Sequence, residues 1–527
     1  MTSTGRRERN WWGWGFADAR IDPHAILGHA QATLGFGGAD GVQDPVTLAD
    51  VALPAPRLDV SALRGASVDR LDRLHHSFGK SYLDTIRAFR GVVDHPVDAV
   101  AHAADERELE AVLEWAGAHN AAVIPFGGGT SVVGGVQPRV PDRFDGAISV
   151  DVSRMSRLLE LDEHSRSALI QAGASGPVLE EQLRAHGLTL RFFPQSFELS
   201  TLGGWIATRA GGHFATARTH IDDLVESVRA ITPTGAWESR RLPGSGAGVS
   251  PDRMLLGSEG TLGIITQAWM RVQPRPAHRA SQAVRFASFA AGAEAVRAIA
   301  QSGLTPANLR LLDELEALQT GAGDGTHAVL VLGFESTAAE VEVDDDLRRG
   351  LVLCREHGGL YEQAPRGTAA SGGAVDTWRD AFLAMPYVRD AMLRCGVLSD
   401  TFETAITWER FPAFHAAVTG AVREALGEPS RVSCRFTHVY PDGPAPYYTV
   451  IAPARRGDEV AQWWEMKRAA SDAITAAGAT ITHHHAVGRD HRPWYDVQRP
   501  DVFAAALAGA KAAVDPRGLL NPGVLID

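Results

Sequence analysis

Cysteine is scarce in this chain. Its three cysteines, Cys354, Cys395 and Cys434, are odd in number and widely spaced among 527 residues. Small disulfide-bonded proteins carry many paired cysteines, and zinc sites commonly carry Cys-x-x-Cys pairs. The sequence therefore excludes a disulfide framework and a cysteine metal site, and we expect buried free thiols in a reducing compartment.

Lysine is also rare, and acidic residues outnumber basic ones. Lysine occurs only as Lys80, Lys467 and Lys511, and the formal net charge is −12 at pH 7. A surface that binds nucleic acid is normally basic, so this composition argues against a nucleic-acid partner. A small anionic substrate remains compatible with it, because one arginine can bind a phosphate.

Long hydrophobic runs are missing too. The longest uncharged stretch, residues 116–138, is interrupted by Gly127-Gly128-Gly129, whereas a membrane-spanning helix needs about 20 consecutive apolar residues. The polar start of the chain lacks the apolar core of a secretory signal, and the last residues are not a Ser-Lys-Leu address. We expect a soluble cytoplasmic protein.

The length exceeds what one hydrophobic core usually serves. We expect an irregular N-terminal region with one or two helices over residues 1–90, a strand-and-helix domain over 91–276, a second α/β domain over 277–480, and a returning C-terminal segment over 481–527. The hydrophobic periodicity predicts helices over 104–118, 177–186, 286–303, 338–357, 412–426 and 501–514, and strands over 121–125, 146–152, 168–173, 328–333 and 446–452.

A glycine-rich loop follows the predicted strand at 121–125. It reads Pro125-Phe126-Gly127-Gly128-Gly129-Thr130-Ser131. Consecutive glycines let successive amide N–H groups point at one anion, and the two hydroxyls add donors, which suits a diphosphate. The loop lacks the Gly-Lys-Ser/Thr of a Walker motif and the Gly-x-Gly-x-x-Gly of a Rossmann fold. Taken alone, a loop of this kind is more often a tight turn than a phosphate-binding site.

Three more stretches of small and hydroxyl-bearing residues occur later in the chain. They are 194–204 (PQSFELSTLGG), 208–212 (TRAGG) and 257–265 (GSEGTLGII). Together with the glycine loop they could line a long, narrow site for an extended dinucleotide. Loops of an unrelated α/β protein would not need all four in this order.

These motifs, followed by DPRGLLNPG at 515–523, resemble the flavin-binding family of vanillyl-alcohol oxidase and the 2-hydroxyacid dehydrogenases. The resemblance implies an α+β fold with a two-subdomain PCMH-type FAD-binding domain and an α/β cap domain containing an antiparallel sheet. It implies FAD bound by Pro125, Gly127, Gly128, Gly129, Thr130, Ser131, Pro194, Ser196, Ser200, Thr201, Gly203, Gly204, Thr208, Arg209, Ala210, Glu259, Gly260, Gly263, Ile264 and Ile265. Many relatives tether the flavin through a histidine beside the glycine loop, and residues 124–130 contain none, so we expect non-covalent FAD.

A run of three histidines, His483, His484 and His485, is expected where a strand meets a loop. In an extended strand, His483 and His485 would share one face and His484 would take the other, which disfavours three ligands on one metal. Metal binding, a partly exposed run with no role, and proton transfer beside the flavin all remain open, and the near-neutral pKa of histidine suits the last.

The histidine run also resembles one group within that flavoprotein class, the alkyldihydroxyacetonephosphate synthase family, which forms the ether bond of ether lipids. The similarity extends nearly end to end, through residues 12–16, 311–313, 386–390, 399–405 and 433–440. It implies that Arg389 binds the substrate phosphate, that Tyr447 is the acid/base, and that His483, His484 and His485 assist proton movement. Ala486 stands where the resemblance implies a glycine, and we expect its methyl group to narrow the space beside the reaction centre.

The implied reaction replaces the acyl group of acyl-dihydroxyacetone phosphate with a long-chain alkyl group, without net redox change and without a metal. Its implied partners are a lipid phosphate and a fatty alcohol, with a homodimer and peripheral membrane contact expected. One alternative is a D-2-hydroxyacid dehydrogenase of the D-lactate or glycolate type, but Tyr447 stands near the place of a metal-binding histidine in those enzymes, and a phenol is a poor zinc ligand. A non-catalytic flavin-binding protein is the other alternative.

Overall fold

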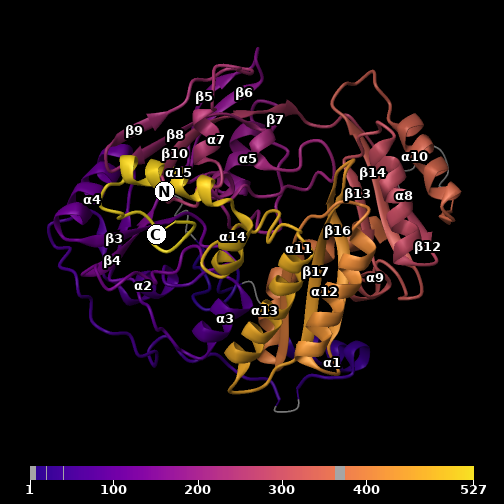
Figure 1. The fold of residues 1–527 in the computed structure, drawn as a ribbon, viewed down its shortest axis with the longest axis horizontal. Helices are drawn as coiled ribbons and strands as arrows, with labels where there is room; N and C mark the ends of the chain where they lie inside the picture. The colour runs from indigo at the N-terminus through magenta and orange to yellow at the C-terminus, as the bar shows by residue number, and fades with distance from the viewer. Residues whose placement is uncertain (1–6, 19–20, 39–40, 363–373, 527) are drawn as a thin grey trace, which may run out of the picture.

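The computed structural model describes residues 7–18, 21–38, 41–362 and 374–526, and Figure 1 shows them as two adjoining bodies. The first body, drawn in indigo to magenta, contains a four-stranded and a five-stranded sheet, and the second, drawn in rose to orange, contains a six-stranded sheet. Helix α14 (Arg492–Gln498) contacts α13 (Glu459–Ala476) of the second body, and helix α15 (Asp501–Val514), drawn in yellow, lies on the first body. The predicted α+β class with an antiparallel cap sheet is confirmed.

The N-terminal region contains three helices over the residues described, where one or two were expected. They are α1 (Pro23–Leu34), α2 (Arg70–His75) and α3 (Tyr82–Phe89), and residues 1–6 lie outside the described part. Helix α1 begins after Asp22, whose side chain accepts a hydrogen bond from the backbone N–H of His24, and ends at Gly35 with φ 79°. These are common start and stop signals of a helix.

The four-stranded sheet has the order β1-β2-β4-β3 and carries the glycine loop at one strand end. Its strands are β1 (Ala66–Ser67), β2 (Ala99–His102), β3 (Ala121–Phe126) and β4 (Gly146–Asp151), with helix α4 (Glu106–Ala118) packed on it. Strands β2, β4 and β3 are parallel. The C-terminal segment joins the edge of this sheet, since Val123 and Leu520 form a parallel bridge.

The five-stranded sheet is antiparallel, with the order β5-β6-β10-β8-β9. Its strands are β5 (Leu158–Asp162), β6 (Ser167–Gln171), β8 (Val225–Thr232), β9 (Gly235–Glu238) and β10 (Ile264–Arg271). Around it lie α5 (Gly176–Arg184), α6 (Leu202–Thr208), the 3-10 turn η1 (Ile221–Asp223), α7 (Pro251–Leu255) and the strand pair β7 (Leu188–Thr189) and β11 (Gln273–Pro274).

The six-stranded sheet is antiparallel throughout, with the order β12-β14-β13-β16-β17-β15. Its strands are β12 (His278–Phe286), β13 (Asn308–Leu312), β14 (Ala328–Ser336), β15 (Val397–Glu403), β16 (Arg431–Val439) and β17 (Pro444–Pro453). The accompanying helices are α8 (Phe289–Gln301), α9 (Glu314–Gln319), α10 (Asp344–Glu356), α11 (Ala374–Arg394), α12 (Phe411–Leu426) and α13 (Glu459–Ala476).

Alternation along β17 divides this sheet into a core face and a pocket face. Tyr448 is fully buried in the core formed with the helices, stacked on Phe402 at 4.9 Å between ring centroids. Its neighbour Tyr447 lines a pocket on the opposite face, as the two-residue period of a strand requires. The sheet thereby presents a row of polar side chains to the first body.

None of the helices among the described residues is both long enough and apolar enough to cross a bilayer.

Candidate active site

A deep pocket lies between the two bodies. Its empty volume, including the opening to solvent, is about 1660 Å³. Its first side, here called the glycine wall, consists of the pocket-lining residues within 125–136, 194–212 and 259–265. Its second side, here called the cap wall, consists of the pocket-lining residues within 386–389, 401, 435–438, 447 and 484–485, together with Arg310. The pocket thus extends from the glycine loop to the pocket face of the six-stranded sheet.

The glycine loop packs directly on the second predicted motif. A Cβ atom added at Gly128 would lie 2.2 Å from the carbonyl oxygen of Leu199, and one at Gly127 would lie 2.3 Å from Oγ1 of Thr201. Gly129 adopts φ 67°, a conformation that favours glycine. Glycine is therefore required here by close packing as well as by backbone conformation, and the loop presents backbone rather than side chains to the pocket.

All of the predicted cofactor-binding residues line the glycine wall, with the exception of Arg209. Arg209 ends helix α6 with φ 51°, and its Nε donates to Asp222 at 2.8 Å. Its side chain is 53% exposed, so it lies outside the pocket, contrary to the expectation. The left-handed conformation of Arg209 at the end of α6 directs its side chain away from the pocket. The Thr-Arg-Ala-Gly-Gly motif gives no sign of this conformation.

The glycine wall fits an extended dinucleotide. It combines three consecutive glycines with the hydroxyl groups of Thr130, Ser131, Ser200 and Thr201. Backbone N–H groups and neutral hydroxyls suit a diphosphate, because they donate hydrogen bonds without bulk. The residues present thus match the chemistry of the expected FAD.

Glu259 lines the glycine wall but also holds the C-terminal segment in place. Its carboxylate accepts hydrogen bonds from the backbone N–H groups of Val487 at 2.9 Å and Gly488 at 2.8 Å, and burial raises its pKa to about 7. Its carbonyl accepts a further bond from Asn521 Nδ2 at 2.8 Å. Glu259 therefore joins the loop after the histidine run to the first body.

On the cap wall, Thr401 connects the two residues expected to act on substrate. Its Oγ1 accepts hydrogen bonds from the Tyr447 hydroxyl at 2.9 Å and from Arg389 Nη2 at 3.1 Å. Nε of Arg389 is buried and has no hydrogen-bond partner within the described part of the chain. Arg389 also lines the pocket, where a guanidinium suits an anionic ligand. The sequence reasoning had missed Thr401.

Arg435 is a second residue that the sequence reasoning missed. It pairs with Tyr447 across β16 and β17, and its guanidinium carbon lies 4.0 Å from the Tyr447 ring centroid. The buried carboxylate of Glu316 forms an ion pair with Arg435. A cation over an aromatic face is attractive, so Arg435 fixes the orientation of the Tyr447 ring.

Arg310 brings a third arginine to the cap wall. It lies on β13, is 3% exposed, and donates from Nη2 to the carbonyl of His213 at 2.9 Å. Burial, followed by the nearby charge of Arg435, lowers its pKa to about 9. In the sequence, Arg310 stands among apolar residues of the strand, and this isolated charge could have identified it as a site residue.

The histidine run is not at the end of a strand, so the expected alternation of faces is wrong. Residues 481–487 form bends around the buried carboxylate of Glu403, which accepts backbone N–H bonds from His483 at 2.7 Å and His485 at 2.9 Å. His484 and His485 line the pocket, with ring centroids 6.0 and 5.4 Å from that of Tyr447, and His483 does not line it.

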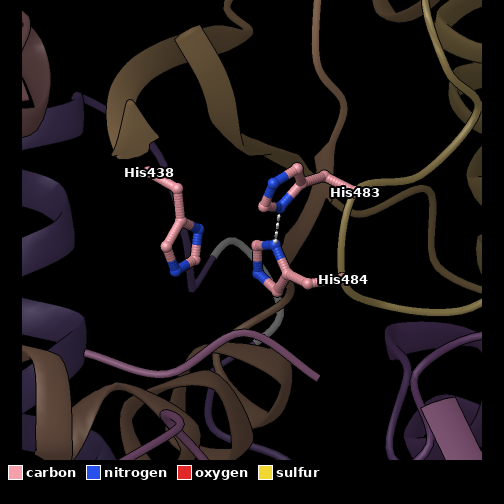
Figure 2. A group of neighbouring side chains, drawn as sticks. All are labelled: His438, His483 and His484. Atoms are coloured by element: carbon pink, nitrogen blue, oxygen red, sulfur yellow. Dashed lines mark hydrogen bonds between the residues drawn. The ribbon is translucent and has the colours of Figure 1, made fainter. Parts of the chain in front are cut away.

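Figure 2 shows His483 and His484 meeting ring to ring beside His438. The Nδ1 atoms of His483 and His484 are 3.0 Å apart in a hydrogen bond, and ligand-type nitrogens of all three residues lie within 4.8 Å of one another. Burial lowers the pKa of each of the three rings well below its ordinary value. The cluster therefore consists of neutral imidazoles, each with one N–H and one lone pair.

The tryptophan-rich segment near the N-terminus, residues 11–16, lies against the same pocket through Trp14. Trp14 lines it, and its backbone N–H donates to the carboxylate of Asp390 at 2.7 Å. Burial raises the pKa of Asp390 to about 7 and lowers that of Lys80 to about 8. Asp390 thus anchors the N-terminal segment, and its neighbour Arg389 is left to face the pocket.

Ala486 adopts φ 74°, in the left-handed region that favours glycine. It is 8% exposed and is not among the residues that line the pocket. Its methyl group does not narrow the space beside the cap wall, which is where we had expected its effect, so the departure from glycine affects backbone conformation instead.

Two family models match the chain. Residues 97–239 match the FAD binding domain, and residues 275–525 match the C-terminal domain of FAD linked oxidases. These matches agree with the fold and with the expected cofactor.

Similar sequences and solved structures narrow the family assignment. An alkyldihydroxyacetonephosphate synthase of Dictyostelium discoideum is 31% identical over 487 residues, covering 87% of this chain and 78% of the relative, and one of Caenorhabditis elegans is 29% identical, covering 98% and 95%. A solved alkyldihydroxyacetonephosphate synthase structure superposes with a TM-score of 0.79 at 26% identity, covering 98% of both chains. The chain belongs to the alkyldihydroxyacetonephosphate synthase family, within the PCMH-type FAD-binding flavoproteins.

Proposed function

We propose that the protein uses FAD to exchange the acyl group of acyl-dihydroxyacetone phosphate for a long-chain alkyl group, with no net redox change. The observation that carries this proposal is the bridge through Thr401, which places Arg389 and Tyr447 side by side on the cap wall. A phosphate-binding cation and a proton-transfer group must lie close together if both are to act on one three-carbon substrate.

Arg389 binds the substrate phosphate in this proposal. Its planar guanidinium can donate two parallel hydrogen bonds to phosphate oxygens, and Arg389 lines the pocket. Arg310 lies on the same wall and adds positive charge.

Tyr447 transfers protons at the reacting carbon. Its hydroxyl donates to Thr401, and its ring contacts the guanidinium of Arg435 and lies beside the rings of His484 and His485. His484 and His485 accept or return the proton near the pocket, since neutral imidazole has a free lone pair. Within the histidine run, the role of His483 is indirect because it does not line the pocket.

FAD bound to the glycine wall supplies the nucleophile for the exchange. Arg209 is omitted from the proposed cofactor ligands, and the other predicted residues of that wall are retained. We propose non-covalent binding, because none of the residues lining the glycine wall is a histidine or a cysteine. Acid precipitation should release FAD into the supernatant, and flavin that remains with the precipitated chain would refute this.

The exchange should need no metal, and extensive chelation should leave its rate unchanged. The competing D-2-hydroxyacid dehydrogenase activity would predict a stoichiometric metal ion and loss of activity on chelation. A non-catalytic flavin-binding protein is disfavoured by the polar cap wall, since a chain without catalysis has no use for three arginines and a tyrosine in its pocket. Homodimerisation, a cytoplasmic location and peripheral membrane contact remain predictions.

The test is a label-transfer assay without an electron acceptor. Acyl-dihydroxyacetone phosphate and labelled hexadecanol should give a labelled ether product. In a parallel anaerobic experiment, D-lactate or glycolate should leave the flavin absorbance unchanged. Rapid bleaching by a hydroxy acid, with no label transfer, would replace this proposal by the dehydrogenase activity.

A further inference from the structure

The proposed exchange releases one proton in each turnover. The alcohol loses its O–H proton when its oxygen bonds to the substrate carbon, and the fatty acid leaves as a carboxylate, because an ordinary carboxyl has a pKa near 4. The balanced reaction at neutral pH is ester plus alcohol giving ether plus carboxylate plus one proton. A buried pocket that repeats this reaction must pass that proton to solvent.

We propose that His484, His483 and His220 form a proton-transfer chain from the pocket to the protein surface, an inference that rests on the proposed function. His484 lines the pocket and hydrogen-bonds to His483 through their Nδ1 atoms at 3.0 Å. Nε2 of His483 lies 3.1 Å from Nε2 of His220. His220 is partly exposed, next to the exposed side chain of Arg209.

Carbonyl oxygens fix which nitrogen carries the hydrogen at two positions. Nδ1 of His220 lies 2.9 Å from the carbonyl of Arg209, and Nε2 of His438 lies 3.1 Å from the carbonyl of Gly212. A carbonyl only accepts, so each of these nitrogens is an N–H donor. In its neutral form, His220 then has a lone pair at Nε2, directed at His483.

The remaining assignments follow along the chain. A chain that runs outward requires His483 to carry its hydrogen on Nε2, where the hydrogen is shared between Nε2 of His220 and the hydroxyl oxygen of Tyr440, and Nδ1 of His483 is then a lone pair. His484 must donate from Nδ1 to that lone pair, which leaves its own Nε2 lone pair for the pocket. All three rings are therefore aligned to pass a proton outward.

The transfer proceeds in four steps: uptake of the substrate proton by His484, two transfers between ring nitrogens that each break one N–H bond and form another, and release from His220 to water. His484 accepts the substrate proton at Nε2 and gives its Nδ1 hydrogen to His483. His483 then gives its Nε2 hydrogen to His220, which releases a proton to solvent. One proton leaves the pocket and no electron moves. The starting tautomers return when each ring turns over or exchanges its hydrogens with water, because a reverse shift along the chain would carry a proton back into the pocket.

Two neighbours favour this direction. Glu403 lies 3.4 Å from Nδ1 of His484. Burial opposes ionisation of this carboxyl, but hydrogen bonds from the Thr482 hydroxyl and the backbone N–H of His485 lower its pKa, so its negative charge stabilises a transient imidazolium. The hydroxyl of Tyr440, 2.6 Å from Nε2 of His483, is a poor exit, because burial raises its pKa to about 12.

A metal ion is the competing occupant of the same cluster. Zinc–nitrogen bonds of about 2.0–2.1 Å in a tetrahedron place ligand atoms roughly 3.4 Å apart, whereas the candidate nitrogens here spread over as much as 4.8 Å. The hydrogen bond between His483 and His484, drawn in Figure 2, also occupies a lone pair that a metal would need. A proton-transfer chain explains that bond, and a metal site does not.

Nitrogen NMR of the holoprotein tests the arrangement independently of catalysis. With ¹⁵N-labelled histidine and single-histidine variants for assignment, we expect the hydrogen on Nδ1 in His220 and His484 and on Nε2 in His438 and His483. The opposite tautomer at His483 or His484 would overturn the proposal. Stoichiometric zinc in the purified protein, lost in a His438→Asn variant, would do the same.

Kinetics of the His220→Asn variant test whether the chain operates. We expect kcat to fall about tenfold, less than the roughly 10²–10⁴-fold of a direct acid–base group because water can substitute, with KM unchanged. Added imidazole should restore the rate in this variant and not in wild type. The control variant His24→Asn, at an exposed position of α1, should change nothing.

Two further outcomes would overturn the proposal. A His220→Asn variant with an unaltered rate would show that the proton leaves elsewhere, and a slow variant that imidazole does not rescue would show a structural role. A wild-type protein with no label transfer would refute the proposed function instead, while the tautomers would still be measurable.

Discussion

The two walls of the pocket are built on different physical principles. The glycine wall presents backbone groups and small hydroxyls on loops that touch one another, so that a single added methyl at Gly128 would collide with a carbonyl. The cap wall presents long charged and aromatic side chains, among them Arg435 and Tyr447, from neighbouring strands of one sheet. Close packing therefore determines the first wall, and strand register determines the second.

Because the two walls differ in this way, we expect the glycine wall to determine cofactor binding and the cap wall to determine substrate binding and turnover. A change on the glycine wall should alter cofactor affinity, since the backbone must move to accommodate it. A change on the cap wall should alter turnover or substrate affinity with FAD still bound, because the strands remain paired when one side chain is trimmed. Variants of each wall can test that division.

The largest effect is expected for Tyr447→Phe on the cap wall. The change removes only the hydroxyl that Thr401 holds, so turnover should fall roughly 10²–10⁴-fold, the usual contribution of an acid–base group. The flavin content, measured by absorbance, should equal that of wild type. Tyr361→Phe, near helix α10 and away from the pocket, is the control. An undiminished rate in Tyr447→Phe would remove this tyrosine from the mechanism.

Gly128→Ala should produce the next largest effect, and on the other wall. Its Cβ would lie 2.2 Å from the backbone of Leu199, and overpacking of this kind costs about 1–3 kcal/mol. FAD affinity should therefore fall roughly tenfold to a hundredfold, as measured by flavin titration of the apoprotein. Gly244→Ala, at an exposed position with nothing within 4 Å, should bind FAD normally. Equal affinity in both variants would contradict the close-packing account.

Arg389→Lys should raise KM for the acyl substrate about tenfold. The charge remains but the two-pronged guanidinium geometry is lost, which corresponds to about 1.4 kcal/mol. Arg394→Lys on the same helix, whose side chain contacts Asp44 instead, is the matched control. If KM does not change in the Arg389 variant, the phosphate must bind to other residues.

A pH-dependent prediction concerns the sheet beneath the glycine wall. Hydrogen bonds to Asp151 and Asp72 raise the pKa of His102 to about 9. A raised histidine pKa stabilises the fold fully below about pH 6.5, and this contribution is lost as pH rises through about 9. Wild type should therefore lose about 1 kcal/mol of stability over this interval, and His102→Gln should lose less.

The pH dependence can be measured by urea unfolding at several pH values. His164→Gln, at an exposed position, should follow wild type. Parallel pH profiles in wild type and His102→Gln would show that this ion pair does not contribute.

The smallest effect is expected at the loop that joins the two walls. Ala486 has φ 74°, and a left-handed conformation costs an ordinary residue about 1–2 kcal/mol, partly offset by the greater entropy of glycine in the unfolded chain. Ala486→Gly should therefore stabilise the protein by about 0.5 kcal/mol in urea unfolding, with kcat unaltered. A large change in kcat would restore the earlier expectation that this methyl group shapes the pocket.

The two walls also differ in how far the sequence predicts them. The glycine wall could be predicted because its contacts are made by short contiguous motifs, and Arg209 failed only through a left-handed turn within one of them. The cap wall could be predicted only in part. The family resemblance indicated Arg389 and Tyr447, but it did not indicate Arg435, which meets Tyr447 only in the register of β16 and β17. Polar side chains on the pocket face also hid strands β15 and β16 from the hydrophobic pattern.

The histidine run shows the same limit. Its three residues were predicted as site residues, but their geometry depends on Glu403, eighty residues earlier, which collects their backbone N–H groups. No local pattern at 483–485 indicates a distant carboxylate. Tertiary contacts of this kind determine which ring faces the pocket, so the sequence can identify the residues without their orientation.

The origin of the ether oxygen tests the central claim most directly. Hexadecanol labelled with ¹⁸O is supplied with acyl-dihydroxyacetone phosphate, and the products are analysed by mass spectrometry without an electron acceptor. The proposed exchange predicts one ¹⁸O atom in the ether product and none in the released fatty acid, because the bond from substrate carbon to ester oxygen breaks. Label in the fatty acid, or no ether product at all, would contradict the account.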